Sequence, residues 1–343
     1  MPHNAERSSS SVVLYRCPPT LSLPTADPHA LAVECMLRFV GAHYVRRDAA
    51  MPVSIEVPVG ALSDEDTGST TDGPVVSGPA KFERRTGLSA CMQLIESCTH
   101  LDAEILPSSQ LPLSTCIRAL VEKMLLPAFV YITHSEANLF YNSIRKAVVP
   151  KVGTFWQQLR GTYRMDVLKR SVCCGRYNSV GQALEEIENG LRSLDALCVA
   201  NASSTGLFIL GTRRPGSTDA LAYAAASSFF HADFTSRSAS GTIVNAQRRL
   251  KEQCPDLVSY VERLRLQYFD DYSAFYSIRA TKTTQHTSDA AQQAKAVSFK
   301  GRWKLLTFTG VFSLVYFVLA NADVFLQLLT AFEEDEMDDE APQ

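Results

Sequence analysis

The alternation of apolar and polar positions predicts a mixed first part and a helical second part. Val12-Val13-Leu14-Tyr15 is a short β-branched and aromatic run, which indicates a buried strand. Asp27 followed by Pro28 predicts a helix start, with Asp27 as the N-cap and Pro28 as the first helical residue. Apolar positions extend this helix to about Val40, and residues 44–47 can form a second strand. We therefore expect a β-α-β unit, which requires a parallel strand pair.

Two more strands and one helix are predicted before residue 100. The run from Ile55 to Val59 indicates a strand, and residues 74–78 indicate another after a polar loop. A helix follows from about Gly87 to Cys98. The order β-α-β-β-β-α is that of a thioredoxin-like module. We also predict a cis peptide bond before Pro58, because an X–Pro bond is the ordinary site for one.

From Leu111 onward the apolar residues repeat at helical spacing. Ser179 and Gln182 form a capping box, and a stripe from Leu184 to Cys198 indicates a core-facing helix. The predicted helices cover about residues 113–126, 127–148, 152–169, 179–200, 217–230, 241–253 and 255–272, with Pro127 separating the first two. The predicted organisation is a lead at 1–11, a thioredoxin-like domain at 12–105, a helical domain at 110–275, a linker at 276–300, an anchor at 303–332 and an acidic tail at 333–343.

The most apolar stretch of the chain lies close to its C-terminal end. A bilayer core needs about 20 mostly apolar residues as a helix, and the run from Leu305 to Phe332 is long enough. The predicted anchor residues are the basic and aromatic flank Arg302, Trp303 and Lys304, followed by Leu305, Leu306, Phe308, Val311, Phe312, Leu314, Val315, Tyr316, Phe317, Val318 and Leu319. We expect a tail anchor in contact with membrane lipid, with the preceding chain facing the cytosol. The alternative is a buried helix that packs on the domain.

Charge narrows the classes of partner. The chain has a net charge of −3, and the acidic tail alone holds seven carboxylates, so the remainder carries 33 − 29 = +4. An excess this small and dispersed does not indicate a nucleic-acid partner. The acidic tail is either solvated charge or a docking site for basic partners. Nine cysteines without a CxxC pair or a metal-ligand spacing indicate a reducing compartment and no metal.

A thioredoxin-like half followed by a helical half resembles the glutathione S-transferase superfamily. Val57-Pro58 resembles its cis-proline position, and Val75-Val76-Ser77-Gly78 resembles the end of its fourth strand. The run from Phe208 to Gly211, followed by Pro215 to Ala220, resembles its segment that caps a buried helix. The resemblance implies structural roles for Pro58, Ser77 and Gly211. It also implies that Asp219 is the N3 acceptor and that Ser217 caps, because Gly216 stands at the usual cap position.

Within that superfamily the chain most resembles the metaxins. The residues that carry the resemblance are Leu23-Pro24-Thr25-Ala26-Asp27-Pro28 and the helix after them, Ser217 to Tyr223, and Cys254-Pro255 to Phe269. The resemblance implies structural roles for Pro24, Asp27, Pro28, Ser217, Asp219 and Pro255. It also implies a non-enzymatic subunit of the mitochondrial outer-membrane sorting and assembly machinery, whose partners are the other subunits and β-barrel precursor proteins.

The sequence offers few residues that could carry out glutathione transferase chemistry. Cys17 is the one nucleophile near the end of the first strand, but it precedes the predicted helix by about ten residues. Ser77 lacks the acidic or Gln neighbour of the superfamily, because Val76 precedes it. His134 and His231 lie in helical stretches and are interpreted as structural. We therefore expect no catalytic residue and no cofactor. The alternatives are a membrane-anchored glutathione transferase and a tail-anchored adaptor in mitochondrial or peroxisomal dynamics.

Overall fold

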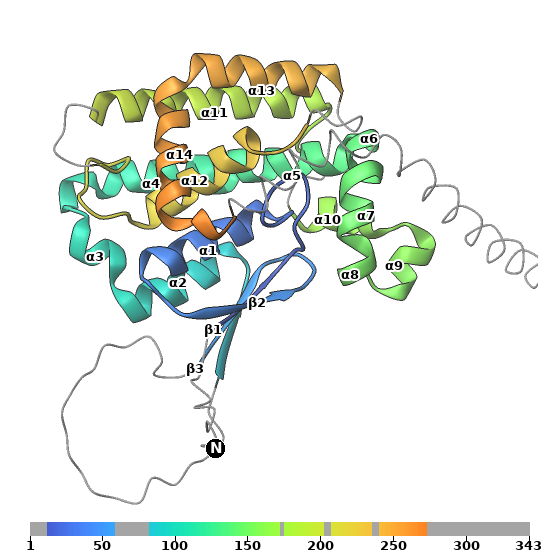
Figure 1. Cartoon of the computed structure of the whole chain (residues 1–343), viewed down its shortest axis with the longest axis horizontal. Coiled ribbons are helices and arrows are strands. Elements are labelled where there is room, and N and C mark those ends of the chain that lie inside the picture. Colours follow the sequence, from blue (N-terminus) through green and yellow to red (C-terminus); the bar gives the residue numbers. More distant parts are fainter. Residues whose placement is uncertain (1–11, 59–81, 172–174, 202–206, 235–239, 273–343) are drawn as a thin grey trace, which may run out of the picture. The chain divides into compact units, whose positions relative to one another are not determined.

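The computed structural model describes residues 12–58, 82–171, 175–201, 207–234 and 240–272. All of them belong to one unit that ends at Tyr276. Figure 1 shows a small sheet at one edge of this unit, with most of the helices on one side of it. The predicted anchor and the acidic tail lie outside the described residues. No helix among the described ranges is long and apolar enough to cross a membrane.

A four-stranded mixed sheet forms the N-terminal half. Its elements are β1 (Val12–Arg16), α1 (Pro28–Phe39), β2 (Tyr44–Asp48), β3 (Ser54–Pro58), β4 (Phe82–Thr86) and α2 (Leu88–Thr99). The strand order is β2-β1-β3-β4, with β1 parallel to β2 and both other pairs antiparallel. Helices α1 and α2 contact each other and the strands, so both cover the same face of the sheet. This topology confirms the predicted thioredoxin-like half.

Two local predictions in this half have different outcomes. The strand predicted at residues 74–78, which includes Ser77, lies outside the described residues, and the strand that pairs with β3 is β4. The prediction of a cis bond before Pro58 is wrong: the cis bond of the described residues joins Met51 to Pro52. Pro58 instead ends β3, in register with Phe82, where a strand tolerates a residue without an N–H.

Helices make up the rest of the unit. They are α3 (Leu101–Ile105), η1 (Ser108–Gln110), α4 (Leu111–Leu120), η2 (Val121–Leu125), α5 (Leu126–Ser135), α6 (Ala137–Leu139), η3 (Phe140–Ile144), α7 (Arg145–Ala147), α8 (Val149–Val152), α9 (Phe155–Arg160), α10 (Tyr163–Arg170), α11 (Val180–Asn201), α12 (Ser217–Phe230), α13 (Gly241–Gln253), α14 (Pro255–Tyr268) and η4 (Asp270–Tyr272). The segments η2 and η3 are π-helical, whereas η1 and η4 are 3₁₀ turns.

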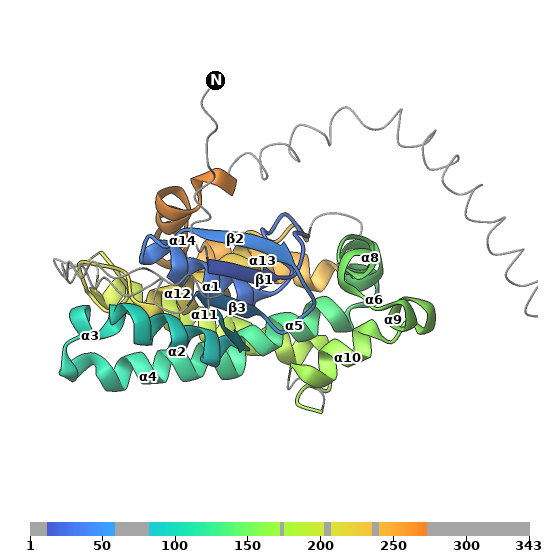
Figure 2. The same ribbon diagram turned by 90° about the horizontal axis from the view of Figure 1, so that it is seen from below.

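Helix α12 is the centre of the unit. All fourteen of its residues are buried, as expected for a helix with neighbours on every side. It contacts α1 of the sheet half and α4, α5, α13 and α14 of the helical half. Because α1 also contacts β1, it lies between the sheet and α12 (Figure 2). One continuous core therefore joins the two halves.

The C-terminal end of the unit is attached to the sheet half by a buried charge cluster. Glu34 on α1 is fully buried and lies 2.8 Å from Arg16 at the end of β1. The hydroxyl of Tyr272 donates to Glu34 and accepts from Arg46 on β2 at 2.7 Å. Arg38 of α1 also binds Asp271 at 2.7 Å. The last described residues are thus held by α1 and β2.

Candidate functional site

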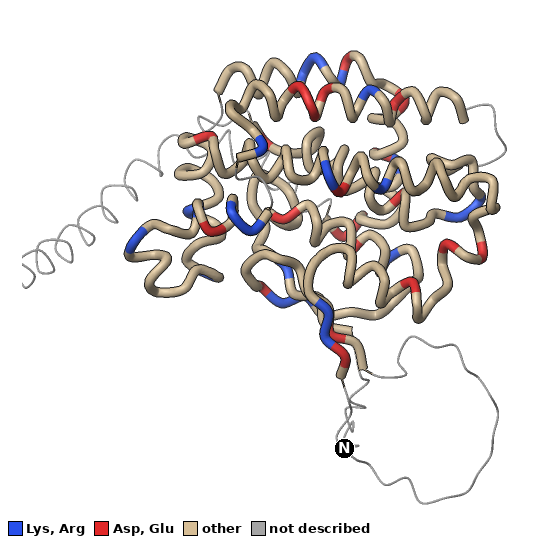
Figure 3. Tube along the Cα trace, turned by 180° about the vertical axis from the view of Figure 1, so that it is seen from behind, with Lys and Arg blue, Asp and Glu red and all other residues tan. Residues whose placement is uncertain are grey.

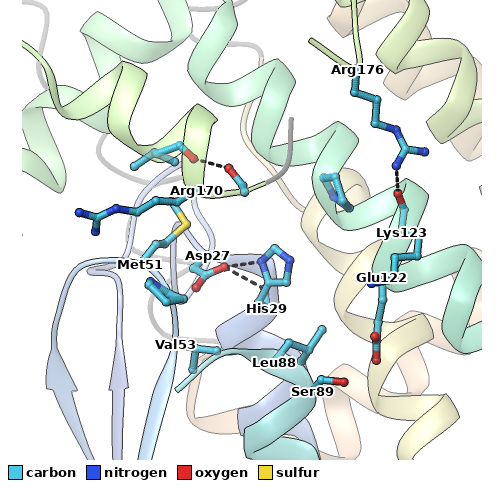
Figure 4. A pocket seen from close by; sticks show the side chains of 14 residues that line it. Asp27, His29, Met51, Val53, Leu88, Ser89, Glu122, Lys123, Arg170 and Arg176 are labelled. Carbon is cyan, nitrogen blue, oxygen red and sulfur yellow. Dashed lines mark hydrogen bonds and ion pairs between the residues drawn. The ribbon is translucent and has the colours of Figure 1, made fainter. Parts of the chain in front are cut away.

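A cavity lies between the sheet half and the helical half. Its volume is about 670 Å³, within the usual range for a small-molecule site. The sheet half contributes Asp27, His29, Met51, Pro52, Val53, Leu88 and Ser89, and the helical half contributes Glu122, Lys123, Pro127, Val167, Arg170, Ser171 and Arg176. Figure 4 shows these side chains arranged around the cavity. Both halves contribute apolar as well as polar side chains to the wall.

The N-terminus of α1 forms one side of the cavity. Asp27 is 1% exposed and is the N-cap, and Pro28 is the first helical residue, as predicted. The Asp27 Oδ1 atom accepts from the His29 backbone N–H at 3.0 Å and from His29 Nδ1 at 2.9 Å. A carboxylate oxygen can only accept, so Nδ1 is the donor in this contact. A carboxylate therefore occupies the positive end of this helix.

Cys17 lies in the same β1–α1 loop but is not an exposed nucleophile. Its side chain is 1% exposed, and its carbonyl accepts from the Thr25 hydroxyl at 2.8 Å. Burial raises the pKa of the Cys17 thiol well above its ordinary value, and the nearby Asp27 carboxylate raises it further. A reactive cysteine needs the opposite environment, with a lowered pKa and access to solvent. The thiol is therefore held in its unreactive form.

A π-helical turn forms the opposite side of the cavity. Pro127 has no N–H, so the carbonyl of Lys123 lacks its usual helical donor. Arg176 of the helical half donates to that carbonyl instead. The chain therefore continues helically from α4 through η2 into α5, and the prediction that Pro127 separates two helices is wrong. The turn directs Glu122 to the cavity, and its Oε1 atom is buried without a hydrogen-bond partner among the described residues.

Sequence reasoning identified one cavity residue, Asp27, and missed the rest. Met51 and Pro52 stand in a stretch that gave no signal. Glu122 lies in a helical pattern and Arg176 in the connection before α11, and the sequence does not distinguish either of them from a surface position. His134 and His231 are not in the cavity. His134 is fully buried in α5, and His231 is bonded to Glu262 at 2.9 Å, in agreement with structural roles.

The other motif residues form a capping site away from the cavity. Asp219 is 2% exposed and accepts from the backbone N–H groups of Gly216 and Ile209, both at 2.8 Å, and from the Tyr260 hydroxyl at 2.5 Å. This confirms Asp219 as the N3 acceptor. Gly211 has a φ of 71°, in the left-handed region that glycine tolerates, and Pro255 opens α14.

The proposed capping role of Ser217 is wrong, because another helix supplies the cap. Gly216 is the N-cap residue of α12, and Ser217 is the first helical residue. Asp102 of α3 accepts from the Ser217 backbone N–H at 2.8 Å and also from the Ser217 hydroxyl. A Cβ atom at Gly216 would lie 2.8 Å from Asp102 Oδ1. The carboxylate of Asp102 thus stands where a capping side chain of residue 216 would be.

The remaining predicted residues have no described position. Ser77 and the anchor residues from Arg302 to Leu319 lie outside the described residues. Within the ranges that the structure describes, no group of three His, Cys, Asp or Glu side chains is placed to hold a metal ion.

The chain has a glutathione-transferase-like fold, defined by its β2-β1-β3-β4 sheet with α1 and α2 on one face and a helical second half. No family model and no curated protein sequence matches the chain. Solved structures similar to it include the Omega 2S glutathione transferase of Trametes versicolor, at 14% identity over 81% of this chain and 97% of that chain, with a TM-score of 0.45. A glutathione transferase of Phanerochaete chrysosporium is 14% identical over 78% and 97%, with a TM-score of 0.44.

A third similar structure is a glutathione transferase family member of Pseudomonas fluorescens with two glutathione molecules bound. It is 11% identical over 76% of this chain and 91% of that chain, with a TM-score of 0.42. Likeness at this level carries no argument about chemistry. The fold class rests on the strand order and helix packing described above.

Proposed function

We propose that this protein is a non-enzymatic, metaxin-like subunit of the mitochondrial outer-membrane sorting and assembly machinery. In this role its transferase-like body binds sister subunits and β-barrel precursor proteins on the cytosolic side. The run from Leu305 to Phe332 holds the body at the membrane. The metaxin-like segments at Leu23–Val33, Ser217–Tyr223 and Pro255–Phe269 favour this role over other non-enzymatic roles.

One observation carries the non-enzymatic part of the proposal. In the transferase-like half, the N-terminus of α1 is the place where helix N–H groups would stabilise a thiolate. Here Asp27 occupies that place, and its buried carboxylate already accepts from the His29 N–H. A second anion would be repelled, and the nearby Cys17 thiol is buried with a raised pKa. This charge arrangement supports a role without thiolate chemistry at the N-terminus of α1.

Depletion of the protein in cells tests the biological role. Assembled β-barrel proteins of the outer membrane should decrease on native gels before helical outer-membrane or matrix proteins are affected. The matched control is re-expression of a Cys17→Ser variant, which should restore barrel assembly fully because the thiol has no chemical role. If barrel assembly holds steady while organelle shape or division fails first, the adaptor role replaces this one.

A membrane-anchored glutathione transferase is the second candidate, and the cavity favours it. A space of about 670 Å³ with the Asp27–His29 pair and the unpartnered Glu122 oxygen on its wall suits a small polar ligand. The test is the purified full-length protein in mild detergent, assayed for retention on immobilised glutathione and for conjugation of a generic electrophile. We expect neither. Turnover that is lost on His29→Ala or Cys17→Ser would replace the proposed role with the enzymatic one.

A further inference from the structure

The segment from Arg145 to Ser171, which comprises α7 to α10, forms a basic lobe on the helical half. It contains seven Lys and Arg residues and a single acidic residue, Asp166, which gives 7 − 1 = +6. The whole chain has a net charge of −3, so this lobe opposes the sign of the rest. Figure 3 shows the lobe with blue positions that outnumber the red. A local charge of this size creates a field that favours an anionic partner.

The same lobe exposes large apolar side chains. Phe155 is 70% exposed, Trp156 60%, Leu159 52% and Met165 48%. Phe155 and Leu159 are four residues apart and Trp156 and Leu159 are three apart, so they share one face of α9. Trp156 also meets Phe155 edge to face, with ring centroids 5.5 Å apart.

The local structure holds this apolar face outward. Thr154 accepts from the Gln157 N–H at 3.3 Å, and the Gln157 side chain accepts from the Thr154 N–H at 3.0 Å, which is a capping box. The amide of Gln157 also donates to Asp166 of α10 at 2.9 Å. Gln157 therefore faces α10, and the aromatic residues beside it face solvent.

Most cations of the lobe lack an acidic partner within the described part of the chain. Arg160 lies 5.3 Å from the centroid of the Trp156 ring. Of the others, Lys151 lies 3.8 Å from Asp48, and Arg164 donates to the carbonyls of His134 and Ser135. Besides Arg164, the cations without a carboxylate within ion-pair distance among the described residues are Arg145, Lys146, Arg160, Lys169 and Arg170. These side chains are exposed and available to an external anion.

We propose that this basic lobe binds the surface of an anionic lipid bilayer, with Phe155, Trp156 and Leu159 inserted at the interface. Exposed aromatic and aliphatic side chains beside Lys and Arg are typical of interfacial helices, in which burial and charge attraction add. The choice of a bilayer over an acidic protein rests on the proposed anchor. Thirty residues, 273 to 302, separate Tyr272 from Trp303, and a chain of that length can reach at most about 100 Å when fully extended. The lobe is then within reach of the bilayer that holds the anchor.

The chain provides its own probe for a test. Its two tryptophans are Trp156 and Trp303. The tryptophan fluorescence of a full-length Trp303→Phe variant therefore comes from Trp156 in α9 alone. This protein is reconstituted into phosphatidylcholine vesicles with or without phosphatidylserine, each prepared with lipids brominated near the headgroup. We expect Trp156 fluorescence to be quenched in the anionic vesicles and to lose about half or more of that quenching in the neutral ones or at high salt.

Two sets of variants separate the lobe from general charge effects. Arg160→Glu combined with Lys169→Glu should abolish most of the quenching by anionic vesicles. Arg213→Glu combined with Arg248→Glu removes the same charge from exposed positions outside the lobe and should leave the quenching unchanged. Leu159→Ser, which retains the charges, should reduce the quenching because it removes apolar contact.

Each outcome bears on a separate proposal. Extraction of the reconstituted protein by carbonate would refute the anchor, whereas carbonate resistance without quenching of Trp156 would refute the lobe proposal alone. A Trp156 emission shift with polyglutamate and none with anionic vesicles would identify an acidic protein surface as the partner instead, and would also overturn the proposal.

Discussion

The unusual N-cap of α12 makes a quantitative prediction about two residues that are far apart in sequence. Asp102→Ala removes the acceptor of the Ser217 N–H and of the Ser217 hydroxyl. Ser217 is fully buried, so the change leaves its N–H without its acceptor at a buried position. Loss of a cap combined with a buried unsatisfied donor costs about 2–3 kcal/mol of unfolding free energy.

The effect of Gly216→Ser on stability should depend on whether Asp102 is present. In the native protein, Gly216→Ser brings a Cβ atom to 2.8 Å from Asp102 Oδ1 and 3.1 Å from Ile105 Cδ1, and the overlap costs about 1–3 kcal/mol. In the Asp102→Ala background the contact with Oδ1 is removed, the remaining contact is with the flexible end of the Ile105 side chain, and a serine hydroxyl can cap α12 locally. Gly216→Ser should therefore restore about 1 kcal/mol to the Asp102→Ala variant. Gly216→Ser should therefore lower the unfolding free energy of the native protein and raise that of the Asp102→Ala variant.

Thermal unfolding of the four full-length proteins, in one detergent and at one concentration, measures this coupling. For a unit of this size, we expect Asp102→Ala to lower Tm by about 4–12 °C and the double variant to recover about 2–4 °C. The control is Gly241→Ser, at a helix start where a Cβ atom meets nothing within 4 Å, and it should rescue nothing. Additive effects of Asp102→Ala and Gly216→Ser would refute the conclusion that Asp102 replaces the missing cap.

Three further predictions follow from other features. Glu34→Gln should cost about 3–5 kcal/mol of unfolding free energy because Arg16 stays buried without its carboxylate, whereas Glu83→Gln at the exposed pair with Arg85 should cost under about 1 kcal/mol by the same thermal assay. Burial lowers the pKa of His134 from 6.5 to about 4, so the unfolded chain binds its proton first and stability should fall by about 3 kcal/mol as pH drops from 6.5 to 4. Denaturant titrations across that range should show a smaller loss for His134→Gln, and equal losses would exclude His134 as the cause. Truncation before Leu305 should release the protein into the supernatant of a carbonate extraction, and its retention in the membrane pellet would require another anchor.

The parts of the fold that the sequence predicted are those with strong local signals. Asp27-Pro28 placed the start of α1 correctly, and the 3–4 stripe together with Ser179 and Gln182 placed α11 within one or two residues. The β-α-β unit followed from the same kind of pattern. These elements are specified by residues that are neighbours in the chain, which is why a single sequence is enough to find them.

The errors come from interactions between distant residues. Pro127 is a helix breaker by local rules, but Arg176 satisfies the carbonyl that it leaves free, so the helix continues. Strand β4, with the sequence FERRT, is mostly exposed and has no apolar alternation, because it is held by pairing with β3. Ser217 was predicted to cap because Gly216 stands at the usual cap position. The true acceptor, Asp102, is 115 residues away and gives no local sign of its role.

The cavity between the two halves was the least predictable feature. It takes its walls from six separate stretches of chain between Asp27 and Arg176, and each contributes one to three residues. No window of sequence contains enough of the cavity to define a motif. The Asp27 carboxylate was predicted as a cap, and its effect on the Cys17 thiol emerged only when the two were placed side by side.

The attachment of Tyr272 to Glu34 determines how the unit responds to mechanical load. The chain beyond Tyr272 leads toward the apolar run at Leu305, so tension along that chain enters the unit at η4. There it is opposed first by the Arg38–Asp271 ion pair and by the hydroxyl of Tyr272 on Glu34. Force is thus carried into α1 and β2, which belong to the sheet half, although α14 belongs to the helical half. A pull from a membrane would therefore strain the sheet half, although that half is far in sequence from η4, where the force enters.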